Sequence, residues 1–244
     1  MKRVLLDIAY DGTDYHGWQV QKNALTVQEV LCKAVTKMLG KTHDVVGTSR
    51  TDAGVHARHF TCHIDCEDNI PETAFVRGIN SLLPSDIAVL ECKRVPNDFH
   101  ARYNASGKTY RYYIYNSNKK DPFKLRYSWQ IERPLDIDKM NEFAKEIIGT
   151  YDFYAFSSSG RTVEDTVRTV SECYFTREND YVVLTVSANG FLYNMVRIIV
   201  GTAVAVSDGK INPTDIPEII NSKMRDRLGL TAPAQGLFLE KVHY

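Results

Sequence analysis

The segment Thr26–Gly40, TVQEVLCKAVTKMLG, decides the predicted fold. Thr26 and Glu29 have the spacing of a capping box, which begins a helix. Gly40 suits the C-terminal cap of the same helix. Between the two caps the apolar residues recur with the spacing of one buried helical face: Val27, Val30, Leu31, Ala34, Val35, Met38 and Leu39. The segment therefore predicts an amphipathic helix packed on a sheet.

The flanking segments supply that sheet. Residues 3–10, RVLLDIAY, precede the helix and are typical of a buried strand, and THDVVGT and HFTCHIDC follow as two further strands with a polar loop between them. Pro71 begins a second helix, and IAVLECKRV predicts a fourth strand. The predicted order is β-α-β-β-α-β.

The second half of the chain repeats this order. Its predicted elements are, in turn, the strand KTYRYYIYN, the helix IDKMNEFAKEIIG, the hairpin VRTVSECYFTREND with DYVVLTVSA, a helix opening at Asn189 in NGFLYNMVRIIVGTAVAV, and the strand GLFLEKV. We therefore expect an α+β protein of two ferredoxin-like halves with antiparallel sheets, residues 1–105 and 106–244. RNA-recognition motifs share this plan, although a shared fold does not establish a function.

The overall composition does not indicate the partner. The 244 residues are 43% hydrophobic and 25% charged, which is ordinary for a globular protein, and 30 Lys and Arg balance 30 Asp and Glu. With a net charge of zero, any nucleic-acid surface must gather its positive charge on one face.

The cysteines and apolar segments disfavour several classes of protein. The five cysteines form no CxxC pair. Cys62 and Cys66 lie in a strand that turns His63 to the opposite face, which favours free thiols in a reducing cytosol over a zinc site.

The N-terminus lacks the features of a signal peptide, and the longest apolar stretch, MVRIIVGTAVAV, contains Arg197 and is too short to span a bilayer. We expect a cytoplasmic protein with no metal and no membrane segment.

A single carboxylate stands out in the loop GTSRTDAGVHA. Asp52 lies between Arg50 and Arg58, with Gly47 and Gly54 close on either side. Neighbouring guanidinium groups favour the ionised carboxylate, which suits a nucleophile or an electrostatic anchor better than a proton donor. The alternative is a turn aspartate that only bonds nearby backbone N–H groups.

This loop resembles, almost letter for letter, the catalytic motif of the tRNA pseudouridine synthase A (TruA) family. Four further blocks are similar to that family, in order across nearly the whole chain: YDGTDYHGWQ, FHARYNASGKTYRYYI, NGFLYNMVRIIVG and APAQGLFLEKVHY. The resemblance implies an isomerase that converts uridine to pseudouridine at positions 38, 39 and 40 in the anticodon stem-loop of tRNA. It also implies a homodimer that needs no cofactor and holds RNA in basic clefts made by both subunits. We expect an RNA-binding cleft between the two halves of the chain.

The same resemblance implies roles for individual residues. Asp52 is the expected nucleophile, and Tyr110 is expected to stack on the target base and help the proton transfer. Arg197 is expected to pair with the catalytic aspartate, and Arg58 to enter the space left by the flipped base. Arg50 is expected to hold a substrate phosphate or to orient the loop.

Each of these roles has a simpler alternative. Tyr110 belongs to a tyrosine-rich strand and could be a core residue, and Arg197 could satisfy any buried acid. Arg58 could belong to an ordinary solvated surface. Lys108 and Arg111 are candidate phosphate contacts, although most surface lysines and arginines bind nothing specific.

Two other function classes are open. A non-catalytic RNA-binding module would keep or improve its function after Asp52→Ala, because a carboxylate repels phosphate. A glycosidase-like hydrolase would need a second carboxylate about 5–10 Å away, for which Asp11 and Asp14 are the sequence candidates. Release of free uracil would favour the hydrolase.

Overall fold

The computed structural model describes residues 2–66, 70–160 and 164–244 and divides the chain into two compact units. Unit 1 comprises Met1–Ser106 and Phe238–Tyr244, and unit 2 comprises Gly107–Leu237. Each unit combines helices with a mostly antiparallel sheet, so the protein belongs to the α+β class. None of the helices in the described ranges is long and apolar enough to cross a membrane.

The C-terminal strand departs from the expected division at residue 105. The sequence order placed it in the second half, but Phe238 and Leu239 pair in parallel with His56 and Ala57 of unit 1. The chain end returns to the first sheet, a long-range pairing that the order of elements does not reveal.

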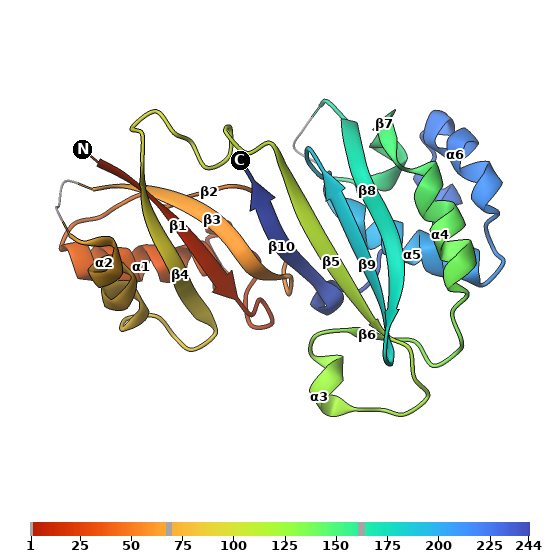
Figure 1. Ribbon diagram of the computed structural model, residues 1–244, viewed down its shortest axis with the longest axis horizontal. Helices are drawn as coiled ribbons and strands as arrows, with labels where there is room; N and C mark the ends of the chain where they lie inside the picture. Colours follow the sequence, from red (N-terminus) through yellow and green to blue (C-terminus); the bar gives the residue numbers. More distant parts are fainter. Residues whose placement is uncertain (1, 67–69, 161–163) are drawn as a thin grey trace. The chain divides into compact units, whose positions relative to one another are not determined.

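The sheet of unit 1 has the strand order β4-β1-β3, and β3 pairs along its other edge with β10 and β2. β1 pairs antiparallel with both of its neighbours. The helices α1 and α2 lie on one face of this sheet (Figure 1). The elements are β1 (Lys2–Tyr10), α1 (Val27–Leu39), β2 (Val46–Gly47), β3 (His56–Cys66), α2 (Glu72–Asn80), β4 (Ile87–Val95) and β10 (Leu237–His243).

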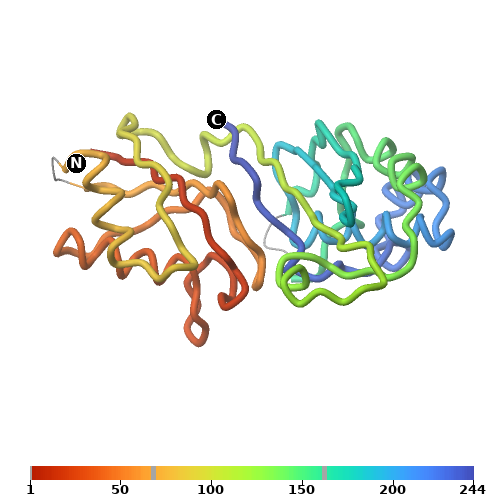
Figure 2. Tube along the Cα trace, turned by 60° about the horizontal axis from the view of Figure 1, so that its bottom comes forward, coloured from red at the N-terminus to blue at the C-terminus, as the bar shows by residue number. Residues whose placement is uncertain are grey.

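Helix α1 confirms the prediction from its capping residues. The Thr26 hydroxyl accepts a hydrogen bond from the Glu29 backbone N–H at 3.4 Å, and Gly40 ends the helix in the left-handed region at φ 70°. Val27, Leu31 and Val35 of its apolar face are completely buried. The connection from β1 to this helix protrudes from unit 1, as Figure 2 shows.

Strand β2 is much shorter than the predicted strand THDVVGT. Only Val46 and Gly47 pair with β3. Two side chains take the backbone groups that a longer ladder would use: His43 Nδ1 bonds the carbonyl oxygen of Asp65 at 2.9 Å, and Gln28 Nε2 donates to the carbonyl oxygen of Val45 at 2.8 Å. The chain here is held by side chains instead of strand pairing.

The sheet of unit 2 has the strand order β5-β9-β8-β7, with β6 parallel to β5, and helices α4 and α5 pack together beside it (Figure 1). The predicted hairpin is confirmed, and its turn has Asn179 at φ 56°. The strands are β5 (Gly107–Tyr115), β6 (Trp129–Gln130), β7 (Gly149–Asp152), β8 (Val167–Glu178) and β9 (Tyr181–Ala188). The helices are α3 (Pro122–Leu125), α4 (Ile137–Glu146), α5 (Met195–Ser207) and α6 (Ile216–Ser222).

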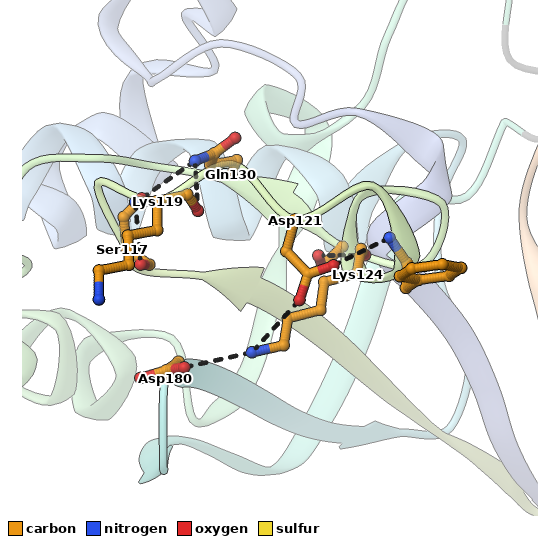
Figure 3. A network of polar contacts seen from close by, with 8 residues as sticks. Ser117, Lys119, Asp121, Lys124, Gln130 and Asp180 are labelled. Atoms are coloured by element: carbon orange, nitrogen blue, oxygen red, sulfur yellow. Dashed lines mark hydrogen bonds and ion pairs between the residues drawn. The ribbon is translucent and has the colours of Figure 1, made fainter.

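The connection between β5 and β6 leaves the sheet and carries the short helix α3. A polar network holds it in place (Figure 3). Lys124 Nζ lies 3.2 Å from Asp180 Oδ2 in the β8–β9 turn, and Gln130 Nε2 donates to the carbonyl oxygen of Ser117 at 3.1 Å. The first contact fixes α3 to the β8–β9 turn, and the second joins the two ends of the connection.

Helix α5 begins later than predicted. The sequence suggested an opening at Asn189, but the first helical residue is Met195, because Asn194 adopts the left-handed conformation at φ 62°. A left-handed residue cannot continue a right-handed helix. Residues 191–194 therefore form a separate segment between β9 and α5.

Candidate active site

The loop that contains Asp52 connects β2 to β3 in unit 1. The Val55 N–H donates to the Asp52 carbonyl oxygen at 3.2 Å, which closes a tight turn, and Gly54 takes the left-handed conformation at φ 76°. Asp52 is half-buried and Arg50 is exposed. The turn thus presents one carboxylate and one guanidinium from positions two residues apart.

Residues 10–18 hold this loop by direct hydrogen bonds. The Trp18 N–H donates to the Thr51 carbonyl oxygen at 3.3 Å, and the Gly54 N–H donates to the Tyr15 carbonyl oxygen at 3.2 Å. The hydroxyl oxygens of Tyr10 and Thr51 are 2.9 Å apart in a buried hydrogen bond. The residues on both sides of Asp52 are therefore fixed to the β1–α1 connection.

Two glycines allow this close approach of backbones. A Cβ on Gly12 would lie 2.0 Å from the Val55 carbonyl oxygen, and a Cβ on Gly17 would lie 2.2 Å from the Thr51 carbonyl oxygen. Gly17 also has φ +81°, which favours glycine. No side chain fits at either position unless the loop moves.

His56, at the start of β3, is a hydrogen-bond acceptor beneath the loop. Its Nδ1 accepts the Gly12 N–H at 3.0 Å and lies 3.1 Å from Asp11 Oδ1. Because Nδ1 accepts the Gly12 N–H, we assign the ring proton to Nε2. His56 thereby bonds the β1–α1 connection that supports the Asp52 loop.

Trp18 and Phe60 form the packed base under the loop. Their rings stack with centroids 4.1 Å apart, and both side chains are almost completely buried. Gly47 lies directly against the indole, where a Cβ would come within 2.6 Å. Trp18 is therefore a packing residue.

Arg58 points toward the C-terminal strand. Its Nε lies 3.3 Å from Glu240 Oε2, and its guanidinium carbon lies 5.2 Å from the centre of the Phe238 ring. The side chain is 51% exposed, so this surface ion pair contributes little to stability. A bound polyanion has access to the guanidinium.

Tyr110 and Lys108 lie on one face of β5 in unit 2, because side chains alternate along a strand. Tyr110 is 6% exposed, and its ring packs edge-on against Phe191 with centroids 5.0 Å apart. Arg111 points to the other face, where it pairs with Glu178 and lies 5.3 Å from the Tyr113 ring.

Arg197 lies in the first turn of α5. Its Nε donates to the Ala232 carbonyl oxygen at 2.7 Å, and its Nη1 donates to Asn194 Oδ1 at 2.8 Å. Segment 191–194 therefore contacts Tyr110 through Phe191 and Arg197 through Asn194. One segment of unit 2 therefore contacts both of these candidate site residues.

The two thiols of β3 lie in the core of unit 1. Cys62 and Cys66 are buried, and burial raises the pKa of the Cys62 thiol well above its usual range. Among residues 2–66, 70–160 and 164–244, no group of three or more His, Cys, Asp or Glu side chains is placed to hold a metal ion.

The sequence pattern alone does not reveal which residues support the Asp52 loop. Gly12 and Gly17 lie in the quoted segment YDGTDYHGWQ, and two glycines five residues apart in a polar connection were the available signal. Their partners Val55 and Thr51 are more than thirty residues away along the chain. No periodic pattern reports a contact of that kind.

Comparison with known proteins identifies the family. A family model described as tRNA pseudouridine synthase matches residues 8–104 and 143–244. Proteins named tRNA pseudouridine synthase A from Thermoanaerobacter sp. (strain X514) and Acetivibrio thermocellus are each 46% identical over 244 residues, covering 100% of both chains. The protein of the same name from Clostridium acetobutylicum is 45% identical with the same coverage.

Proposed function

Because the chain belongs to the tRNA pseudouridine synthase A family, we propose that Asp52 is its catalytic nucleophile. The enzyme isomerises uridine in tRNA to pseudouridine. The reaction breaks the N1–C1′ bond, turns the uracil and joins C5 to C1′, while C5 loses a proton and N1 gains one. All other atoms of the nucleoside are retained. The detached uracil must therefore stay enclosed in the site while it turns, beside a carboxylate in a fixed position.

The observation that supports this assignment is the bracing of the loop around Asp52. Thr51 and Val55, on either side of the turn, are both buried and held by residues 10–18. A nucleophile held in one geometry avoids the entropy cost of finding the reactive position, which contributes to the rate. A turn aspartate with only a local structural role does not need this long-range support.

The remaining residues have proposed roles around the flipped base. Tyr110 stacks on the uracil and assists the proton transfer, and Arg197 pairs with the Asp52 carboxylate. Taking the base out of its stack costs a few kcal/mol, which an aromatic ring offsets. The buried position of Tyr110 beside Phe191 gives it a fixed ring orientation.

The basic residues are proposed to contact the RNA itself. Arg58 enters the space left by the base, and its exposed guanidinium supports that role. Arg50, exposed beside Asp52, holds a phosphate or orients the loop. Lys108 and Arg111 bind phosphates, although Arg111 must first exchange Glu178 for the RNA.

We further propose that the substrate positions are 38, 39 and 40 of the anticodon stem-loop, and that the enzyme is a cytoplasmic homodimer. The two compact units are its two domains, each with a ferredoxin-like plan. In unit 1 the strand order β4-β1-β3-β2 with helices after β1 and β3 supports that plan. Size-exclusion chromatography with light scattering tests the dimer.

The decisive experiment replaces the carboxylate. Asp52→Asn and Asp52→Ala should bind a tRNA transcript within about threefold of the unchanged chain and release no tritium from tRNA labelled at C5 of uridine. Asp138→Asn, an exposed aspartate on α4, is the matched control and should keep full activity. Undiminished tritium release by Asp52→Ala would refute the assignment, and release of labelled free uracil by the unchanged enzyme would indicate hydrolysis instead.

A further inference from the structure

Unit 1 has an open groove of about 460 Å³ that begins at the catalytic loop. Its lining includes Ser49 and Arg50, three and two residues before Asp52. It also includes His100, Arg102 and Tyr103, from the segment between β4 and β5. The groove therefore starts within about 7 Å of the Asp52 backbone, the reach of two residues.

The outer wall of the groove is an aromatic platform. Tyr103 is 77% exposed, although tyrosine usually buries most of its ring. The His100 ring backs it, with centroids 4.3 Å apart and planes 32° from parallel, and the Arg102 guanidinium carbon lies 5.9 Å from its centre. A ring supported from behind and open in front is suited to stacking on a flat ligand.

The turn that presents this platform is fixed by hydrogen bonds. The Ala101 N–H donates to His63 Nδ1 at 3.1 Å, which ties the turn to β3. His100 Nδ1 accepts the backbone N–H groups of Arg102 and Tyr103 at 3.1 and 3.3 Å. The platform is thus arranged before any ligand arrives, and binding need not order it.

The charges around the groove favour an anionic ligand. Arg50 and Arg102 both line it, whereas Asp44 is the single carboxylate among the described lining residues. In the described part of the chain, the Ser49 hydroxyl oxygen is buried and has no hydrogen-bond partner. Two cations and an exposed ring match the phosphate and the base of a nucleotide.

We propose that this groove binds the nucleotide next to the target uridine in the substrate RNA. Its base stacks on Tyr103, and its phosphate lies between Arg50 and Arg102. The assignment rests on the proposed function, since it requires an RNA whose target base is presented to Asp52. When one base is flipped, its neighbour loses a stacking partner, and Tyr103 supplies a replacement.

The test uses three variants of the full chain. Tyr103→Ala should lower kcat/KM on a tRNA transcript about 5- to 150-fold, mainly through KM, because stacking on an aromatic side chain is worth about 1–3 kcal/mol per base. Tyr103→Phe keeps the ring and should stay within about twofold of the unchanged enzyme. Arg102→Ala should weaken binding and reduce its salt dependence.

Matched controls come from outside the groove. Arg77→Ala removes an exposed arginine from α2, and Tyr174→Ala removes a tyrosine of β8 that is 39% exposed. Both should keep kcat/KM within about twofold. Thermal unfolding of every variant checks that the fold is intact.

A direct readout places 2-aminopurine beside the target uridine in an anticodon stem-loop. Its fluorescence should change on binding to the Asp52→Asn chain, and this change should be absent with Tyr103→Ala in the same background. An unchanged signal or an unchanged KM in Tyr103→Ala overturns the groove proposal. Continued isomerisation by Asp52→Asn would refute the nucleophile alone, so the two failures are distinguishable.

Discussion

Substituting Gly12 by alanine tests whether catalysis depends on the bracing of the Asp52 loop. The added Cβ would lie 2.0 Å from the Val55 carbonyl oxygen and 2.7 Å from its carbon. Ordinary van der Waals contact begins near 3.4 Å, so one backbone or the other must move by about 1.4 Å. Both segments are part of the same hydrogen-bonded unit, and the movement is transmitted to the turn at Asp52.

The expected consequence is a loss of rate more than of affinity. A misplacement of about 1 Å in a catalytic group can cost about 100-fold in rate, and overpacking costs about 1–3 kcal/mol of stability. Gly12→Ala should therefore lower kcat about 100-fold at saturating tRNA. The tRNA dissociation constant should change less than about threefold, because the substitution replaces none of the groove residues and none of the exposed arginines.

The assay measures tritium release from uridine C5 under single-turnover conditions, with thermal unfolding in parallel. Gly78→Ala is the matched control, because its Cβ would meet only the flexible end of Met38, at 2.8 Å. That variant should keep kcat within about twofold. If Gly12→Ala is folded and keeps kcat within about threefold, the loop does not need its brace and the reasoning is wrong.

Three further outcomes follow from the same structure. Tyr10→Phe leaves the buried Thr51 hydroxyl without its partner and should lower the free energy of unfolding by about 1–3 kcal/mol, measured by urea denaturation, with a smaller loss of kcat than Gly12→Ala. Thr26→Ala removes the cap that accepts the Glu29 N–H and should cost about 1 kcal/mol in the same assay, without a change in kcat. Burial lowers the pKa of His63 to about 4, below its unfolded value of about 6.5, so stability should fall as pH drops from about 6.5 to about 4; equal slopes in the unchanged chain and in His63→Asn would contradict this.

Local patterns were sufficient where local forces decide the structure. The capping box at Thr26 and the apolar spacing after it predicted α1, and the predicted strand IAVLECKRV is β4. Helix α5 began late because one residue, Asn194, is left-handed, and hydropathy carries no information about that angle. Element types were therefore easier to predict than their ends.

Side-chain directions were partly available from the sequence. Arg111 is one residue from Tyr110, so strand alternation alone places them on opposite faces of β5. The expected roles, Tyr110 on the target base and Arg111 on a phosphate, place both residues on the same RNA and do not use this information. By contrast, the contact of Arg58 with Glu240 depends on the parallel return of the chain end to β3, which no local pattern reports.

Residues 10–18 and the Asp52 loop are far apart in the sequence, but their contacts make them one structural unit. Gly12 contacts Val55 and Gly17 contacts Thr51, so one glycine supports each side of Asp52. Holding the backbone on both sides of Asp52 reduces the freedom that the proposed nucleophile loses when substrate binds. The proposed position of the nucleophile therefore requires the two glycines, although neither of them touches the substrate in the proposed reaction.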